Sequence, residues 1–198
     1  MLPENIIFIG VVLNLFFTIL YVRSIFKNKT KPNPISWFVW TLAPAVGVFL
    51  QIKAGANLSV LGTFMAGFGP FLVLTISLIF KKEAFWKINL LDIVCCSFAI
   101  FSLILYIITH KLGISILFAV LADFLAYIPI MIKTYKFPET ENTLIFLGGI
   151  INNILALLII KNWEFAIYAF PVYLILANTF EIFLISRKCF RIKETKIS

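Results

Sequence analysis

Seven long apolar runs dominate this chain of 198 residues and restrict what it can fold into. A helix needs about 20 mostly apolar residues to cross the hydrocarbon core of a bilayer, and each run approaches that length. Inside lipid the backbone must satisfy its own hydrogen bonds, so the runs are predicted to be helices rather than strands. The seven predicted membrane helices are Ile6–Phe26, Ile35–Ile52, Leu58–Phe80, Leu90–Thr109, Ile114–Ile132, Thr143–Ile160 and Phe165–Ser186.

Composition agrees with a membrane protein. Hydrophobic residues make up 62% of the chain and charged residues only 13%, whereas a soluble domain has about 25% charged residues. The first run follows Met-Leu-Pro-Glu-Asn, with neither a basic segment nor a small-residue cleavage site. We therefore expect a retained helix there rather than a signal peptide.

The basic residues predict the orientation in the membrane. With seven crossings, three basic residues fall on one side, namely Lys53, Lys111 and Lys161. Fourteen fall on the other, which the positive-inside rule places in the cytoplasm. The N-terminus is then outside the cell and the C-terminus inside, in the plasma membrane. The same distribution explains the net charge of +8 without nucleic acid. The fourteen are Arg23, Lys27, Lys29, Lys31, Lys81, Lys82, Lys87, Lys133, Lys136, Arg187, Lys188, Arg191, Lys193 and Lys196.

The chain also contains an internal repeat. An offset of 109 residues aligns the first predicted helix with the fifth, and an offset of 108 aligns 49–53 with 157–161. An offset of 101 or 102 brings 67–70 beside 169–171. The sequence thus predicts two parallel three-helix units, 1–83 and 113–198 with its basic tail, joined by a linker helix in 84–112.

This arrangement resembles the PQ-loop and SWEET-like (MtN3) transporter superfamily. The resemblance rests on the turn at 27–37 and on the stretch 127–136, in which a proline precedes apolar and basic residues. Ile130 stands where the glutamine follows that proline in the family, which suggests a divergent small bacterial-type branch. The resemblance implies an all-α membrane fold of seven helices arranged 3+1+3, and transport by alternating access.

Asp123 is the most informative single residue. It lies halfway along its predicted helix, where a carboxylate costs about 2.5–3.5 kcal/mol. Such residues usually face a bundle interior or a watery cavity and mark substrate or ion pathways. We therefore expect Asp123 to bind substrate and to be the candidate for proton coupling. A structural hydrogen bond between helices is the alternative.

Other polar residues at similar depth complete the candidate site. Asn14 and Thr18 form a stripe that the repeat matches with Asp123 and Tyr127. We expect these four side chains, with Asn152 and Asn178, to converge on a central cavity, although polar contacts between packed helices would give the same pattern. Four prolines inside predicted helices are candidate hinges, because proline interrupts helical hydrogen bonding. These are Pro44, Pro70, Pro129 and Pro171.

The predicted function is therefore transport of a small polar solute, sugar-like or otherwise, with proton coupling as an option. The rival is a non-transporting scaffold, assembly factor or receptor subunit. An enzyme acting on a lipid-linked substrate through Asp92 and Glu181 is weaker, because catalytic motifs are missing from the sequence. We expect no cofactor and no metal, since the only histidine is His110 and the three cysteines lack metal-site spacing. The expected partners are membrane lipid and a small-molecule substrate, with homo-oligomerisation left open.

Overall fold

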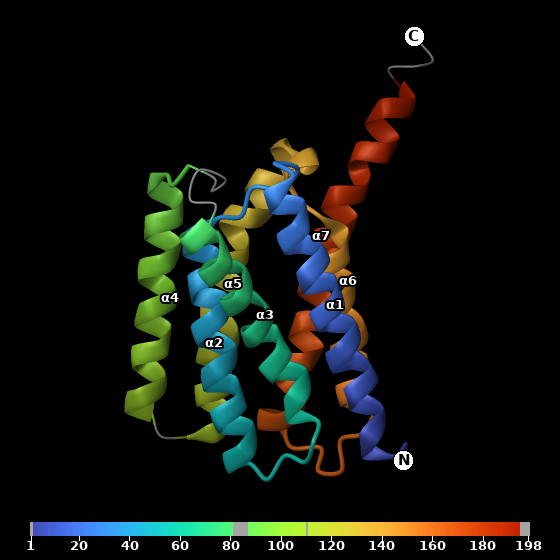
Figure 1. The fold of residues 1–198 in the computed structure, drawn as a ribbon. Coiled ribbons are helices and arrows are strands. Elements are labelled where there is room, and N and C mark those ends of the chain that lie inside the picture. Colours follow the sequence, from blue (N-terminus) through green and yellow to red (C-terminus); the bar gives the residue numbers. More distant parts are fainter. Residues whose placement is uncertain (1, 81–86, 110, 195–198) are drawn as a thin grey trace.

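The computed structural model describes residues 2–80, 87–109 and 111–194, and within these ranges the fold is a bundle of helices (Figure 1). Each predicted segment corresponds to one α-helix, and most ends agree within two residues. Two short 3-10 helices are added, η1 (Glu4–Ile6) and η3 (Pro138–Thr140). The α-helices are α1 (Ile7–Phe26), α2 (Pro34–Lys53), α3 (Val60–Phe80), α4 (Leu90–Thr109), α5 (Leu112–Lys136), α6 (Thr143–Leu158) and α7 (Phe165–Glu194).

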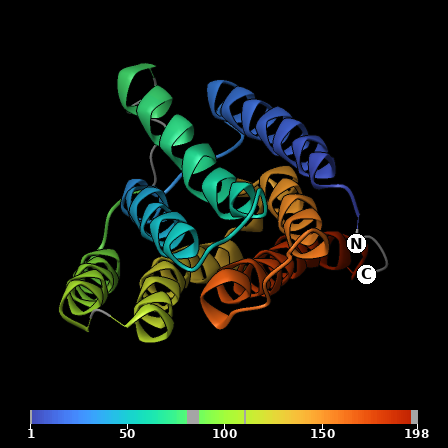
Figure 2. The same cartoon turned by 90° about the horizontal axis from the view of Figure 1, so that it is seen from below.

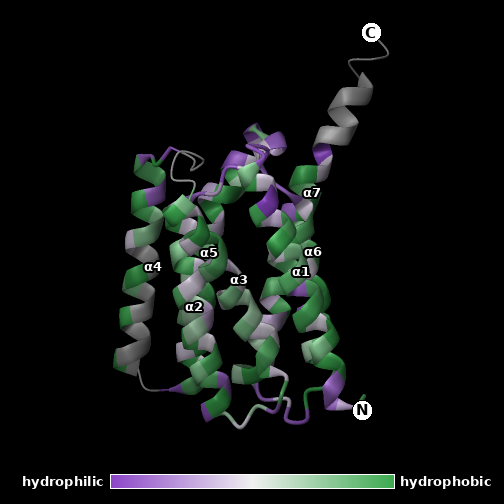
Figure 3. Cartoon of the chain, in the orientation of Figure 1, coloured by the Kyte–Doolittle hydropathy of each residue, from purple (hydrophilic) through white to green (hydrophobic). Residues whose placement is uncertain are grey.

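Five of the described helices are long and apolar enough to cross a membrane, namely α1, α2, α3, α5 and α7. The apolar helix α6 is shorter, with 16 residues. Large hydrophobic side chains such as Phe16 and Leu121 point away from the bundle, and polar residues gather at its two ends (Figure 3). This outward apolar surface suits lipid rather than water. The chain is therefore a membrane-embedded, multi-pass helical protein.

Each half of the chain packs in the same way. Helix α3 contacts both α1 and α2, and α7 contacts both α5 and α6. Between the halves, α1 packs on α6 and α2 packs on α5. Helix α4 lies at the outside of the bundle against α5 and α2 (Figure 2). Six helices thus enclose the interior, and α4 does not contribute to it.

Equivalent asparagines begin the second helix of each half. The Asn33 side chain accepts a hydrogen bond from the backbone N–H of Ile35 at 3.1 Å. The Asn142 side chain accepts one from Leu144 at 2.9 Å. Both are helix N-caps, which satisfy backbone donors that have no partner within the helix. The two caps lie 109 residues apart, the offset found for the first helix of each half.

Asp92 holds the start of α4 in place. It lies in the first turn of this helix, and its two carboxylate oxygens accept hydrogen bonds from the side chain of Asn33 and the backbone N–H of Asn89, each at 2.6 Å. The residue is buried. Its contacts connect α4 to the N-cap of α2, which gives Asp92 a structural role.

The two ends of the bundle differ in charge. We call the end where α1, α5 and α7 finish the basic end, because exposed Arg23, Lys27, Lys29 and Lys136 lie there. At the opposite end, Lys161 forms an ion pair with Glu4, and Lys53 and Lys111 are exposed. The chain enters the bundle at the start of α1 and leaves it at the end of α7, and these two points lie at opposite ends of the bundle (Figure 1). Of the positions named from the sequence, Lys81, Lys82, Lys196 and His110 lie outside the described residues.

Candidate functional site

A cavity of about 50 Å³ lies inside the bundle, between the two halves. A buried water needs roughly 10–15 Å³ of such space, so the cavity has room for a few water molecules. Pockets that hold drug-sized ligands are larger, about 300–1,000 Å³. The cavity in this structure is therefore too small for a ligand of that size. The lining residues are Asn14, Thr18, Trp37, Trp40, Met65, Ala66, Gly69, Pro70, Asp123, Tyr127, Ile145, Phe146, Gly149, Leu174 and Asn178.

The structure brings five of the six predicted binding residues together at this cavity, on α1, α5 and α7. Asn14 and Asp123 face the same space from the two halves, as the repeat predicted, and all five are buried. The sixth residue, Asn152, is not among the lining residues. The five that line the cavity are Asn14, Thr18, Asp123, Tyr127 and Asn178.

The carboxylate of Asp123 is only partly satisfied. The residue is 1% exposed, and the Tyr173 hydroxyl donates a hydrogen bond to its Oδ2 at 2.9 Å. The indole N–H of Trp40 donates to the Asp123 backbone carbonyl at 3.3 Å. The other carboxylate oxygen, Oδ1, has no hydrogen-bond partner among the described residues. Sequence reasoning missed Tyr173, which lies one residue before the cavity-lining Leu174.

A second hydrogen bond crosses from α5 to α7. The Tyr127 hydroxyl donates to Oδ1 of Asn178 at 2.7 Å. Gly149 on α6 makes room for this pair, because a Cβ atom there would lie 2.6 Å from the Asn178 side-chain nitrogen. On α1, the Thr18 hydroxyl donates to the backbone carbonyl of Asn14 at 2.9 Å and so bonds within its own helix.

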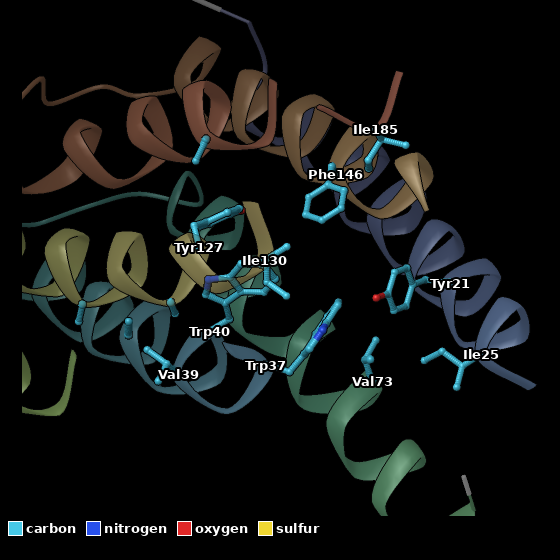
Figure 4. Close-up of a cluster of buried hydrophobic side chains, with 14 residues drawn as sticks. Tyr21, Ile25, Trp37, Val39, Trp40, Val73, Tyr127, Ile130, Phe146 and Ile185 are labelled. Carbon is cyan, nitrogen blue, oxygen red and sulfur yellow. The ribbon is translucent and has the colours of Figure 1, made fainter. Parts of the chain in front are cut away.

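Aromatic side chains form the wall of the cavity toward the basic end (Figure 4). The ring centroids of Trp37 and Trp40 lie 5.4 Å apart, and those of Trp40 and Tyr127 lie 4.3 Å apart. Phe146 meets Trp40 edge-on at 6.5 Å. The indole N–H of Trp37 has no hydrogen-bond partner among the described residues. The lining thus includes a buried unused donor on Trp37 and a buried unused acceptor on Asp123.

Asn152 and its neighbour Asn153 pack helices together instead of lining the cavity. The Asn152 amide donates to the Gly62 backbone carbonyl on α3 at 3.0 Å. Asn153 donates to the Gly149 carbonyl within its own helix at 2.8 Å. Gly10 on α1 lets α6 approach, since a Cβ atom there would meet Asn152 Oδ1 at 2.8 Å. For both asparagines, the helix-packing alternative describes the observed contacts.

The four prolines lie inside α2, α3, α5 and α7, and each helix continues past its proline. Pro70 lines the cavity. Proline at position 171 leaves the carbonyl four residues earlier without its helical donor, and that carbonyl, on Ile167, accepts from the Gln51 side chain at 3.1 Å. Gln51 also donates to Thr63 at 2.8 Å. These contacts join α2, α3 and α7 between the cavity and the opposite end. The role of the prolines as hinges stays a prediction.

Most residues of the cavity lining are spaced by one common offset, the 109 positions predicted for the first helix of the repeat. Twelve of the fifteen lining residues form six pairs whose members lie 109 positions apart. For α3 and α7, the offset of 109 differs from the offset of 101 or 102 that was expected from aligning 67–70 with 169–171. The six pairs are Asn14 and Asp123, Thr18 and Tyr127, Trp37 and Phe146, Trp40 and Gly149, Met65 and Leu174, and Gly69 and Asn178.

A buried ionic layer lies beyond the aromatic wall, at the basic end. The Lys133 ammonium forms an ion pair with Glu141 and donates to the Lys31 backbone carbonyl at 2.6 Å. The Tyr21 hydroxyl donates to the second Glu141 oxygen at 2.9 Å. Glu181 is also fully buried here. Sequence reasoning assigned Lys133 to the charged surface, because it directly follows the apolar run that ends at Ile132.

Comparison of the chain with protein-family models, curated proteins and solved structures gave no match. The chemistry of the site must therefore be interpreted from its own groups. The described residues include no cluster of three or more histidine, cysteine, aspartate or glutamate side chains suited to a metal ion. A carboxylate, two amides and several aromatic rings around a small cavity are groups suited to binding a small polar molecule.

Proposed function

We propose that this protein transports a small polar solute across the plasma membrane, as a transporter or facilitator related to the PQ-loop and SWEET-like superfamily. The observation that carries the proposal is the matched lining of the central cavity. Asn14, Asp123 and Asn178 surround one small space inside the bundle, and polar side chains buried in a membrane bundle commonly mark a substrate or ion pathway. A transporter built from two parallel repeats places its substrate there.

The proposed architecture has seven crossings arranged 3+1+3, with the N-terminus outside. Its support is the equivalent packing of the two halves, in which α1 pairs with α6 and α2 with α5. The asparagine caps 109 residues apart add to this support. In this arrangement α4 is the extra crossing that keeps both halves parallel, and its place outside the bundle suits a linker.

Alternating access requires a barrier on each side of the site. Toward the basic end the barrier is the aromatic wall followed by the pair of Lys133 and Glu141. Toward the opposite end it is the layer of Gln51, Thr63 and the Ile167 carbonyl. We propose that the small cavity belongs to a state with both barriers in place, and that the helices bend at the four prolines to open one barrier at a time.

The proposed substrate is defined by the unused groups of the lining. It presents a hydrogen-bond donor to Asp123 Oδ1 and an acceptor to the Trp37 indole N–H. Stacking against Trp40 and Tyr127 favours a molecule with a flat or apolar face. Sugar-like and other small polar solutes meet this description. Asp123 is also the residue proposed to carry a coupling proton, because the other lining residues named here have no acidic side chain.

Cysteine accessibility tests whether the cavity takes part in transport. In a background with the three native cysteines replaced by serine, Asn14→Cys and Asp123→Cys are expected to react with a small charged thiol reagent. Phe16→Cys and Leu121→Cys are matched controls, two residues away on the same helices but 52% and 43% exposed on the lipid-facing surface. These controls are expected to remain unlabelled. If Asn14→Cys and Asp123→Cys resist the reagent from both sides, the interior is dry and the scaffold alternative is favoured.

A second experiment connects binding to flux. A panel of small solutes is screened for those that raise the melting temperature of the purified protein, and the best is assayed for uptake into proteoliposomes. Asp123→Asn keeps the shape of the side chain but removes its charge and its proton-carrying capacity. It is expected to abolish uptake driven by a pH gradient, while the protein remains folded. Unchanged uptake would remove Asp123 from the mechanism.

A further inference from the structure

Glu181 on α7 is a buried carboxylate that the substrate cavity does not use. The residue is 0% exposed, and neither of its carboxylate oxygens has a hydrogen-bond partner among the described residues. It lies one turn beyond the cavity-lining Asn178, toward the basic end. Burying an ionised carboxylate in such surroundings costs the free energy of its hydration, unless a nearby positive charge compensates for the loss.

The groups that face Glu181 contain one positive charge for two carboxylates. On α5, Glu181 interacts with Lys133 and Thr134, and also with Tyr127, which lies two turns before Thr134 on the same helix. The segment after α5 contributes Glu141, and α1 contributes Tyr21. Lys133 is ion-paired with Glu141, which also accepts from Tyr21. The buried layer therefore has an excess of one negative charge when all of its carboxylates and its lysine are ionised.

Thr134 presents a second unused group at the same place. Its side chain is fully buried, and its hydroxyl oxygen has no hydrogen-bond partner among the described residues. The hydroxyl lies beside the Glu181 carboxylate across the contact between α5 and α7, close enough to interact with it but without a well-formed hydrogen bond. Buried polar atoms nearly always have partners. Three buried oxygens without a well-formed hydrogen bond, beside an excess negative charge, suit a small cation.

We propose that Glu181 and Thr134 form a binding site for one monovalent cation, a proton or a sodium ion, next to the substrate cavity. The bound cation balances the ionic layer and allows α5 and α7 to pack closely at the basic end. Loss of the cation leaves repulsion between Glu181 and Glu141 and loosens the barrier there. The site does not depend on the substrate or on transport, so its test is independent of the proposed function.

Glu181→Gln is the main test, because it removes the charge and keeps the shape. The full-length protein in detergent is melted at pH 8 and pH 5, in sodium chloride and in choline chloride of equal ionic strength. In choline at pH 8 the variant is expected to melt roughly 2–4 °C higher than the wild type. Glu139→Gln is the matched control on the exposed surface of η3 and is expected to melt with the wild type under every condition.

The cation is identified by the conditions that remove the difference in melting temperature between Glu181→Gln and the wild type. If it disappears at pH 5 but persists in sodium chloride at pH 8, the site binds a proton. If sodium chloride removes it at pH 8, the site binds sodium, and Thr134→Val should then weaken the sodium effect because an oxygen ligand is lost. A difference that is the same in all four conditions would overturn the proposal. So would a variant less stable than the wild type at pH 8, since Glu181 would then be stabilising as a paired ion.

A measurement on the wild type covers the case in which the variant does not fold. A hydrophobic carbodiimide modifies a buried carboxyl group only while that group is protonated. Modification of Glu181, located by mass spectrometry, is expected to increase from pH 8 to pH 5 for a proton site and to be suppressed by sodium for a sodium site. Modification that ignores both pH and sodium would contradict cation binding.

Discussion

Tyr173 donates a hydrogen bond to the buried Asp123 carboxylate from the helix that also supplies Asn178. Without this bond, the carboxylate would keep its desolvation cost and lose a compensating contact. A hydrogen bond to a charged group contributes more than one between neutral groups, about 1.5–3 kcal/mol. Tyr173 is therefore expected to stabilise the protein and to fix the orientation of Asp123 in the cavity.

Tyr173→Phe tests this role with the loss of one oxygen atom. We expect the free energy of unfolding to fall by about 1–3 kcal/mol, because Asp123 is left without the donor to its Oδ2. Tyr135→Phe is the control, since Tyr135 is exposed and its ring contact with Arg187 does not need the hydroxyl. The control is expected to change stability by less than about 0.5 kcal/mol. Equal unfolding free energies for wild type and Tyr173→Phe would show that the bond contributes nothing.

The chemistry of single residues in the sequence predicted where the candidate site lies, but it did not predict every side chain that forms the site. Asp123 was identifiable because a carboxylate in an apolar run has few acceptable places. Asn152 was misplaced because the glycines and asparagines mark one buried face of α6, and the sequence does not show which neighbouring helix each part of that face meets. Lys133 and Glu141 resemble surface charges in the sequence, eight residues apart around the end of α5, and only the fold shows them paired inside.

At the scale of helices, close packing depends on glycines whose missing side chains leave room for polar groups. Gly149 is the clearest case, because α6 approaches the Asn178 amide at this position. Its equivalent in the first half is Trp40, a large ring that fills the cavity wall. If the two positions are equivalent as the predicted repeat implies, they differ greatly in side-chain size.

Gly149→Ala is expected to destabilise the contact between α6 and α7. The added Cβ atom would lie 2.6 Å from the Asn178 nitrogen, so the side chain or the helix must move. Overpacking of this kind costs about 1–3 kcal/mol, measured as a lower melting temperature. Gly113→Ala is the matched control, because its Cβ atom would meet Phe165 at 3.9 Å, an ordinary contact. In the control, alanine is expected to be neutral or stabilising, since it favours helix. Two variants with equal losses would contradict the packing argument.

The sequence predicted where the helices lie more reliably than it predicted which residues of different helices occupy equivalent positions. Lipid forces apolar runs to be helical, so all seven appear, although α5 and α7 continue four and eight residues past their predicted ends. The register of the third helix in the repeat was expected from glycines and prolines that look alike, 67–70 and 169–171. The cavity lining instead pairs Gly69 with Asn178, two residues with unlike side chains. This pairing rests on shared position around the cavity and not on residue similarity, so the repeat stays a prediction.

For the whole molecule, the decisive question is which end of the bundle faces the cytoplasm. The basic end has the exposed lysines at positions 27, 29 and 136, and the positive-inside rule predicts that it is cytoplasmic. This orientation would also place the ionic layer and the proposed cation site on the cytoplasmic side of the cavity. The layer of Gln51 and Thr63 would then be the barrier facing the outside.

Single cysteines at the two ends test this orientation in intact cells. In the cysteine-free background, Lys111→Cys at the opposite end is expected to react with a membrane-impermeant maleimide added outside. Lys29→Cys at the basic end is expected to react only after the membrane is permeabilised. Both residues are exposed, so a difference in labelling reports sidedness rather than burial. External labelling of Lys29→Cys alone would invert the topology and move the ionic layer to the outer barrier. Labelling of both Lys29→Cys and Lys111→Cys from outside would mean that both positions are on the same side of the membrane. The three helices between them, α2, α3 and α4, would then not all cross it, which contradicts the parallel arrangement of the two halves.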